Sequence, residues 1–358
     1  MFMKDEVFVE CKEVSIGYRD RSKATVVKRD LSLRASSGEM VALIGGNGIG
    51  KSTLLKTIAG FQSPLSGELL IQQRSISNFT SAELAKELSF VSTGIVRVAN
   101  LTVWEMVGLG RFPYTSWFGQ LGEKDEEIME EAIRLVGLSG YENRLINRIS
   151  DGERQRAMIA RALAQDTRIM VLDEPTAFLD ISNKYEIVRI LHKLADERGK
   201  CIIFSTHELN IALSMADRIW LMLGDRVIEG LPEEVAAGGY FESLFPNNSY
   251  LFFDPEKEDF RIRRERKGSV LLSATGPEQI WATKAMERLG FEVHLLPPSS
   301  PSSPSSPSSQ SFRPSIPPSL PLISREANVW TLTNQDNIKD FKTLTELCGE
   351  VKRLMLRP

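Results

Sequence analysis

The sequence predicts an α/β fold over residues 1–245 and a small α+β module over residues 268–358. Two observations predict the first unit. Short β-branched runs alternate with amphipathic stretches, and a glycine-rich segment separates one such run from a helical one. Such alternation is typical of a mainly parallel sheet covered by helices. The length of 358 residues suits two domains of about 150 residues each.

The elements of the first unit follow from their patterning. Strands are expected where short apolar runs are rich in Val, Ile and Leu, and helices where apolar residues recur every three or four positions. The expected strands are residues 7–14, 40–44, 169–172, 201–204 and 219–223. The expected helices are residues 54–59, 124–136, 155–164 and 184–196.

A charged connector, residues 246–267, leads to the second unit. There the expected strands are residues 269–273, 291–295 and 328–332, and the expected helices are 277–289 and 338–354. A low-complexity insertion of proline and serine, residues 297–321, interrupts this module, and its core repeats every three residues over 298–309. Because proline blocks helices and central strands, we expect a passive, exposed loop whose removal leaves activity intact.

The second unit carries no recognisable set of catalytic residues. Its large aromatic residues, Trp281, Phe291 and Trp330, are expected in its core. The basic run 261–267 is interpreted as a solvated connector, with contact to anionic lipid headgroups as the alternative.

Composition narrows the class of protein. Lysine and arginine number 44 against 47 aspartate and glutamate, a net charge of −3, which argues against nucleic acid as a partner. No apolar run approaches the roughly 18 residues that a membrane span needs, and the first ten residues lack the apolar region of a signal peptide. Three scattered cysteines, Cys11, Cys201 and Cys348, fit a reducing compartment. We therefore expect a soluble intracellular protein.

A phosphate-binding loop is the strongest functional signal. It has the order strand, GxxxxGK[ST], helix, between the runs 40–44 and 54–59. Its glycines let backbone N–H groups face phosphates, and the helix N-terminus adds a partial positive charge. Lys51 is expected to reach the β- and γ-phosphates as a catalytic residue, and Ser52 to supply a hydroxyl ligand to Mg²⁺. The residues expected to bind nucleotide here are Gly45, Gly46, Asn47, Gly48, Ile49, Gly50, Lys51, Ser52 and Thr53.

Two acids end an apolar strand. Residues 169–172 are followed by Asp173 and Glu174. A buried strand holds a carboxylate at its tip only where a cation or hydrogen bonds compensate for desolvation. Asp173 is expected to be an outer ligand of Mg²⁺, and Glu174 the general base that polarises the attacking water. Alone, the pattern fits a solvated turn equally well; the phosphate loop favours the catalytic interpretation.

With these motifs in order, residues 5–240 resemble the ATP-binding cassette (ABC) ATPases. The resemblance implies the P-loop NTPase cassette fold, with a mixed-sheet core and a helical subdomain, and ATP and Mg²⁺ as cofactors. It implies that Tyr18 stacks on adenine and that His207 is the catalytic switch histidine at the γ-phosphate.

The resemblance also implies a homodimer. Residues 150–155, which open a helix at Glu153, resemble the family's signature, so Ser150, Gly152 and Glu153 would cap the ATP bound by a partner subunit. Residues 177–180 resemble the D-loop that communicates across that dimer.

Two positions depart from the family pattern. Asp151 stands in the signature where glycine is usual, and it places a carboxylate near a phosphate site unless its side chain points outward. Thr93 stands where the family has a glutamine that senses Mg²⁺ and the attacking water. Threonine still offers an oxygen, so Thr93 is an expected metal contact with a shorter reach.

A further resemblance concerns the partner. Residues 101–114 resemble the ATPases of importers for iron–siderophore complexes, haem and cobalamin. This implies an ATP-hydrolysing importer subunit, peripheral at the cytoplasmic face of the inner (cell) membrane beneath integral-membrane permease subunits. A substrate-binding protein would be an indirect partner, and nucleic acid is not expected. Arg111 and Tyr114 are expected to stay available for the permease's coupling helix.

Two alternatives remain open from sequence. A soluble, non-transport cassette acting on a cytosolic assembly would share every nucleotide-binding residue and would differ only in its partner. A degenerate cassette that binds ATP without turnover is suggested by Asp151 and Thr93, while the intact Lys51, Glu174 and His207 weigh against it.

Overall fold

The structure is a computed structural model. It describes residues 6–20, 23–92, 100–115, 120–224, 226–246, 248–255, 257–263, 265–296, 320–326, 328–335 and 337–355. The chain divides into two compact units, Met1–Arg261 and Ile262–Pro358, and each is described by itself. The division falls within the stretch expected as a connector, part of which folds with the first unit as strands β11 (Leu251–Asp254) and β12 (Asp259–Ile262).

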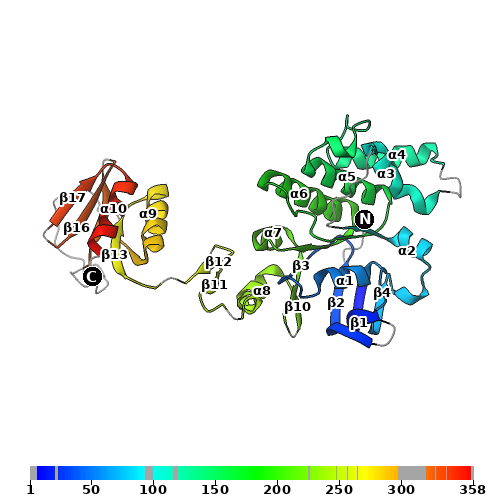
Figure 1. Cartoon of the computed structure of the whole chain (residues 1–358), viewed down its shortest axis with the longest axis horizontal. Coiled ribbons are helices and arrows are strands. Elements are labelled where there is room, and N and C mark those ends of the chain that lie inside the picture. The colour runs from blue at the N-terminus through cyan, green and yellow to red at the C-terminus, as the bar shows by residue number, and fades with distance from the viewer. Residues whose placement is uncertain are drawn as a thin grey trace, which may run out of the picture. The chain divides into compact units, whose positions relative to one another are not determined.

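The first unit contains two larger sheets (Figure 1). The six-stranded sheet is parallel except for its edge strand β10, which pairs antiparallel with β9. Its order is β10 (Val227–Gly230), β9 (Arg218–Met222), β3 (Met40–Gly45), β8 (Cys201–Thr206), β7 (Ile169–Leu172), β6 (Leu88–Val91). The antiparallel sheet has the order β2 (Lys23–Ser36), β1 (Val7–Asp20), β4 (Ser66–Ile71), β5 (Arg74–Ser75).

Three helices of the first unit form a separate helical subdomain. Helices α3, α4 and α5 pack on one another as a helical subdomain, at the top of the unit in Figure 1, and η2 follows α3. The α-helices are α1 (Lys51–Ile58), α2 (Ser81–Glu87), α3 (Val103–Gly108), α4 (Glu123–Leu135), α5 (Asp151–Ala164), α6 (Ile181–Arg198), α7 (Leu209–Met215) and α8 (Pro232–Ala237). The short 3₁₀ helices are η1 (Ile76–Asn78), η2 (Leu109–Tyr114), η3 (Ile146–Arg148) and η4 (Tyr240–Leu244).

Strand β3 is buried on both faces, which explains its unbroken apolar run. Met40, Ala42 and Ile44 belong to one hydrophobic core, and Val41 and Leu43 to the other. Successive side chains of a strand point to opposite faces, so a strand covered on both sides is apolar throughout. The packing on both faces fixes the end of β3, where the glycine-rich loop begins.

The second unit is a five-stranded sheet with two helices, α9 (Gly276–Leu289) and α10 (Leu344–Met355). Apolar residues of the sheet and of both helices form one core. The strand order is β14 (Phe291–Leu295), β13 (Gly268–Ser273), β15 (Leu322–Glu326), β16 (Val329–Asn334), β17 (Asn337–Phe341).

The expected elements of the second unit were wrong in two places. The helix expected over residues 338–354 is a strand, β17, followed by α10. The break has a physical cause: Thr343 Oγ1 accepts the Glu346 N–H, a helix-start pattern that separates the two periods. Strand β15 was not expected. Of the insertion at residues 297–321, residues 297–319 lie outside the described residues.

Trp281 was expected in the core and is instead 61% exposed. Helix α9 buries its small residues and Met286 against the sheet, so Trp281 faces outward with Lys284 Nζ 4.8 Å from its ring centre. Phe291 and Trp330 are buried, as expected.

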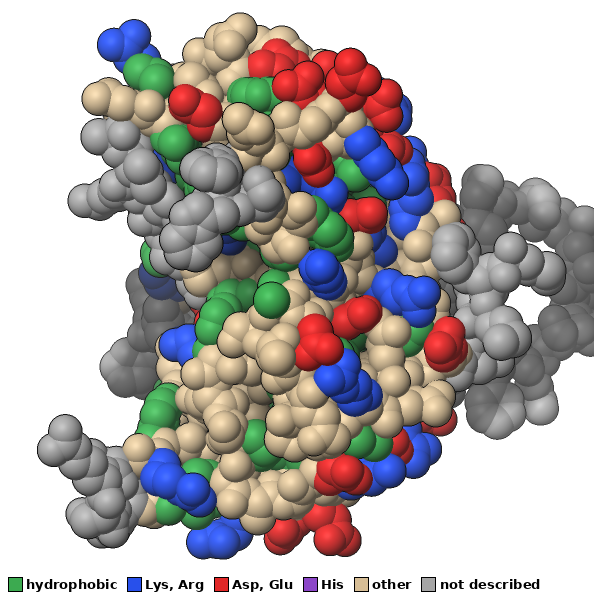
Figure 2. Space-filling view, turned by 90° about the vertical axis from the view of Figure 1, so that its right-hand side faces the viewer, with side chains coloured by type: hydrophobic (Ala, Val, Ile, Leu, Met, Phe, Trp, Pro, Cys, Tyr) green, Lys and Arg blue, Asp and Glu red, His purple; other side chains and the backbone are tan. Residues whose placement is uncertain are grey.

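The described surface agrees with the near-neutral charge. Figure 2 shows acidic and basic side chains interspersed over the visible face of the first unit, with acidic ones gathering at its upper edge. None of the helices in the described ranges combines the length and hydrophobicity that crossing a bilayer requires.

Candidate functional site

The glycine-rich loop joins β3 to α1. Gly48 and Gly50 have φ angles of 72° and 116°, a region that favours glycine. A Cβ on Gly50 would also lie 2.5 Å from Val27 Cγ1, whereas one on Gly46 or Gly48 would meet nothing within 4 Å. The loop is therefore packed on one side and open on the other, where phosphates would approach the start of α1.

Lys51 occupies the centre of this loop. Its Nζ donates to the carbonyl oxygens of Gly45 (2.8 Å) and Gly46 (3.2 Å) and lies 3.3 Å from His207 Nε2. Burial lowers the pKa of the ammonium, and the carboxylates of Glu174 and Asp173 oppose that shift. The loop therefore holds a positive charge at the position where phosphate charge would be neutralised.

The other residues of the loop are open to solvent to different degrees. Ser52 is exposed at the first turn of α1, and Asn47 and Ile49 are at least partly accessible. Tyr18 is 56% exposed and its hydroxyl hydrogen-bonds Thr53 Oγ1 at 2.8 Å. An open aromatic ring is thus fixed beside the loop, in a position suited to stacking on a flat base.

The two acids lie beside the end of β8. Asp173 is buried, and its Oδ1 accepts a hydrogen bond from Ser205 Oγ at 2.8 Å. The same Ser205 Oγ accepts the backbone N–H of Glu174 at 2.8 Å. Glu174 Oε1 lies 2.6 Å from His207 Nε2. Lys51, His207, Glu174, Ser205 and Asp173 therefore form one continuous chain of polar contacts.

Sequence reasoning did not select Ser205. The available signal was a polar residue ending a buried strand, one register step beyond the pair Leu172 and Phe204. Because β7 and β8 are parallel neighbours, residues 173 and 205 come together at the same edge.

The signature segment forms the N-terminus of α5. Ser150 caps the helix: Glu153 N–H donates to its Oγ (3.2 Å), and Ser150 N–H donates to Glu153 Oε2 (2.7 Å). The Tyr141 hydroxyl and the Ser150 N–H hold the pKa of Glu153 below its ordinary value. The helix begins at Asp151, two residues earlier than expected, because this capping box starts it there.

The unusual Asp151 points outward. Its carboxylate is largely exposed and pairs with Arg154 Nη1 at 2.6 Å. Arg154 also donates to the carbonyls of Ile146 and Ile149, so its position is fixed. The carboxylate is therefore neutralised within its own segment. The contacts described for residues 150–153 are with one another and with Tyr141, Arg154 and Asn183, none of which belongs to the glycine-rich loop.

Residues 177–180 form a turn that starts α6. Phe178 has a φ of 63° and is 83% exposed, while Asp180 caps the helix through the Asn183 N–H. Thr93, the expected third metal contact, lies outside the described residues.

Arg111 is not available for a partner, contrary to expectation. It is buried, with Nε 2.8 Å from Asp125 Oδ1 and Nη1 2.8 Å from the Ala164 carbonyl oxygen. Its guanidinium also stacks on Tyr114. Phe112 is the most exposed large apolar side chain of η2, at 65%, and Tyr114 is exposed at 40%.

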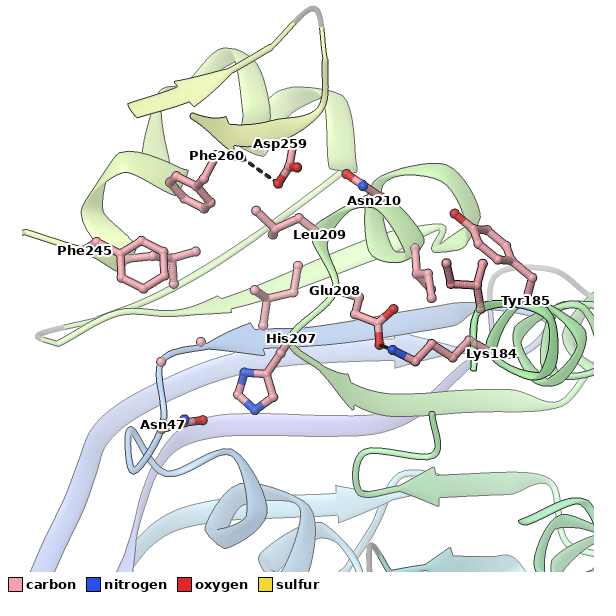
Figure 3. A pocket seen from close by; sticks show the side chains of 16 residues that line it. Asn47, Lys184, Tyr185, His207, Glu208, Leu209, Asn210, Phe245, Asp259 and Phe260 are labelled. Atoms are coloured by element: carbon pink, nitrogen blue, oxygen red, sulfur yellow. Dashed lines mark hydrogen bonds and ion pairs between the residues drawn. The ribbon is translucent and has the colours of Figure 1, made fainter. Parts of the chain in front are cut away.

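A cavity of about 650 Å³ opens beside the site (Figure 3). Asn47 and His207 lie at its lower edge, and the Lys184–Glu208 ion pair forms part of its wall. Phe245 and Phe260, from the segment after α8, close the opposite side. The polar chain is therefore accessible at His207 from this cavity.

Comparisons with known proteins identify the family of the chain. The sequence profile described as ABC transporter matches residues 28–177. The chain is 38% identical to the petrobactin import ATP-binding protein FpuC of Bacillus anthracis, over 68% of this chain and 90% of that one. It is 35% identical to the iron(3+)-hydroxamate import ATP-binding protein FhuC of Bacillus subtilis, again over 68% and 90%. A dimeric cassette structure, MJ0796, superposes with a TM-score of 0.55 at 29% identity, over 63% of this chain and 98% of that one.

Proposed function

The chain belongs to the ATP-binding proteins of ABC transporters, and from that membership we propose that it powers an importer of iron(III) chelates of the siderophore class. The observation that carries the proposal is the polar chain from Lys51 through His207 and Glu174 to Asp173. The import names of FpuC and FhuC, together with the resemblance of residues 101–114, support the substrate class.

Binding of ATP rests on the loop and on Tyr18. The open side of Gly46 and Gly48 leaves backbone N–H groups free to approach phosphate oxygens. Lys51 moves from the loop carbonyls to the β- and γ-phosphates, and Tyr18 stacks on the adenine ring. The tie between Tyr18 and Thr53 sets the spacing of base and phosphates.

Hydrolysis uses Glu174 as the general base. Its carboxylate orients a water molecule and takes its proton as the water oxygen bonds to the γ-phosphorus, while the bond to the β–γ bridging oxygen breaks. His207 holds the carboxylate in place, and Ser205 fixes the backbone beneath it. Since most of this reaction's catalysis is positioning and charge stabilisation, these fixed contacts are the contribution of the protein.

The oxygen donors of the site fit Mg²⁺. Ser52 offers a hydroxyl at the start of α1, and Asp173 offers a carboxylate already oriented by Ser205. Hard oxygen ligands combined with substrate phosphates are the usual environment of protein-bound Mg²⁺. When bound, the ion neutralises charge on the β- and γ-phosphates.

The proposed assembly is a homodimer beneath a permease, on the cytoplasmic side of the inner membrane. Each signature segment, with Ser150, Gly152 and Glu153, would cap the nucleotide bound by the other copy. The dimeric state of the MJ0796 cassette supports this arrangement. A substrate-binding protein would deliver the chelate and contact this chain only through the permease.

Replacement of Glu174 tests the chemistry. We expect Glu174→Gln to retain ATP binding, to lower kcat by about 100-fold or more through loss of the base, and to accumulate an ATP-bound dimer. Glu197→Gln, an exposed acid on α6, is the matched control and should hydrolyse ATP like wild type. Phosphate release and size-exclusion chromatography with light scattering measure both properties. Rapid turnover by Glu174→Gln would remove Glu174 from this role.

Uptake tests the transport claim. Cells lacking this gene are complemented with wild type or Glu174→Gln, and uptake of ⁵⁵Fe-labelled siderophore, haem and cobalamin is compared. Restoration of iron–siderophore uptake by wild type alone is the expected result. Recovery of soluble partners without a permease, when Glu174→Gln with ATP is purified from gently solubilised membranes, would contradict the importer proposal.

A further inference from the structure

Asn183 lies between two segments that the proposed function assigns to the dimer face. It is in the first turn of α6, where its Nδ2 donates to Asp180 Oδ2 at 2.7 Å and its backbone N–H donates to Asp180 Oδ1 at 2.9 Å. The carboxylate of Asp180 therefore holds both the backbone and the side chain of Asn183. The bond at Nδ2 orients the amide of Asn183, and the bond at the backbone N–H fixes the helix start that carries it.

The other side of this amide faces the signature glycine. A Cβ on Gly152 would lie 2.6 Å from Asn183 Cγ and 2.7 Å from its Oδ1. At such distances one of the two groups must shift, so a larger residue at 152 would displace the Asn183 side chain from its place beside Asp180. Gly152 is buried at this contact.

A second tie joins the same helices one turn further on. Arg156 Nη1 lies 2.8 Å from Glu186 Oε1, which links α5 to α6 again. Residues 152 and 156, and likewise 183 and 186, share one helix face. Two contacts therefore hold the N-terminal turns of α5 and α6 side by side.

We propose that Asn183 is a positioning residue that locks the signature segment to the Asp180 turn. Asn183 transmits its effect through Gly152 and Asp180 and touches no nucleotide itself. When a second copy docks, the signature and the turn at residues 177–180 move together as one rigid surface. This inference rests on the proposed function, because it is the dimer that gives both segments their role.

A double-mutant cycle between positions 152 and 183 tests the contact. We expect Gly152→Ala to lower kcat about tenfold, the size typical of coupling between contacting residues. It should leave the nucleotide Kd of the monomer within about twofold of wild type. In an Asn183→Ala background the added methyl finds space, so the same substitution should cost less than about twofold.

Dimer formation is the second readout. In the Glu174→Gln background, Gly152→Ala should weaken the ATP-dependent dimer, and adding Asn183→Ala should restore it only to the level of the Asn183→Ala variant itself, in which the lock is absent. Asn183→Asp keeps the volume but sets a second carboxylate against Asp180, and it should lower kcat with little change in KM. Asn210→Ala removes an exposed amide on α7 and is the matched control, expected to match wild type. If Gly152→Ala folds only together with Asn183→Ala, the contact is equally supported.

Different results would contradict the proposed function and the proposed role of Asn183. If the parent chain shows no ATPase activity and Glu174→Gln forms no dimer with ATP, the proposed function fails. If both parents behave as expected but Gly152→Ala costs the same in the wild-type and Asn183→Ala backgrounds, the positioning role alone is overturned. Wild-type kcat in Asn183→Asp would overturn it as well.

Discussion

At the scale of single residues, two residues in the stretch that follows β7 have strained backbone conformations. Glu174 and Phe178 have φ angles of 48° and 63°, in the left-handed region that bulky residues rarely adopt. Such conformations cost about 1–3 kcal/mol each and persist where the surroundings hold them. Glu174 is held at its N–H by Ser205 and at its carboxylate by His207. These two contacts hold Glu174 in its strained conformation.

The sequence predicts some of these residues and not others. The glycine-rich loop, the acids and His207 are recognisable because each chemistry needs its residue type at a set spacing. Ser205 is not, because its contact with Asp173 depends on the register of two parallel strands 32 positions apart. The outward direction of Asp151 is likewise set by Arg154 and its two carbonyl contacts, a geometry that spacing does not specify.

Ser205→Ala tests whether the hydrogen bonds of Ser205 hold Asp173 and Glu174 in place. The substitution leaves an oxygen of the buried Asp173 and the Glu174 N–H without their partner, which costs about 1–3 kcal/mol. We expect kcat to fall about 10- to 100-fold while ATP affinity changes little, since Ser205 touches neither Lys51 nor Tyr18. Steady-state phosphate release and binding of a fluorescent ATP analogue measure the two effects.

Ser214→Ala is the control for this prediction. Its hydroxyl bonds the Asn210 carbonyl oxygen on the exposed side of α7, away from the acids. It should leave kcat unchanged. Equal activity of wild type and Ser205→Ala would show that Asp173 and Glu174 hold their geometry without this hydroxyl.

At the scale of elements, helix α5 joins the signature to the segment expected to face the permease. Its 14 residues span about 21 Å at 1.5 Å per residue. At its C-terminal end Arg111 donates to the Ala164 carbonyl oxygen, and a Cβ on Gly110 would lie 2.1 Å from the Arg161 carbonyl oxygen. Segment η2 therefore packs directly on α5. A displacement of η2 by a partner would move the signature end of the same helix.

Arg111→Ala tests how firmly this junction is built. Removing the guanidinium leaves Asp125 and the Ala164 carbonyl without a buried partner, so we expect a loss of about 3–5 kcal/mol in the free energy of unfolding. Arg134→Ala, in an exposed pair on α4, should change it by less than about 0.5 kcal/mol. Urea denaturation followed by circular dichroism compares the two. A small effect at Arg111 would mean that η2 is held by apolar packing alone.

Helices and strands were predicted correctly where a single hydrophobic pattern continued without interruption. The strand at residues 169–172 and the helix α4 were found because their patterns are long or wholly apolar. Residues 338–354 failed because a strand and a helix follow one another across two residues, and their apolar positions merge into one apparent helical period. Strand β15 was hidden because it follows directly on the proline-rich stretch, and one of its partner strands, β13, lies about 50 residues earlier in the sequence.

At the scale of the whole molecule, each unit has its own core. The residues of the tail core come entirely from positions 270–351, and those of the two cassette cores from positions 8–253. A domain with a separate hydrophobic core loses its structure without necessarily taking its neighbour with it. We therefore expect damage to the tail sheet to leave ATP hydrolysis by the first unit unchanged.

The proline- and serine-rich stretch has a topological role that its composition does not reveal. Strands β14 and β15 both run parallel to β13 and lie on opposite sides of it. The chain from Leu295 to Leu322 is thus the crossover between them. Its ends are separated by two strand spacings, about 10 Å, whereas neighbouring Cα atoms are about 3.8 Å apart. A parallel crossover of this kind needs about a dozen residues or more.

Two deletions test whether the tail sheet depends on the length of the proline- and serine-rich stretch or on its composition. Removing residues 298–309 leaves 14 residues between Leu295 and Leu322, from 296–297 and 310–321, and should preserve the tail. Removing residues 297–321 would place Leu296 directly before Leu322, and β13 could no longer lie between β14 and β15. We expect the second deletion alone to expose the tail to limited proteolysis and to abolish its near-UV signal from Trp330, while both variants hydrolyse ATP like wild type. A protected tail after the longer deletion would mean that the sheet rearranges its strand order, and loss of ATPase activity in either variant would show that the first unit depends on the second.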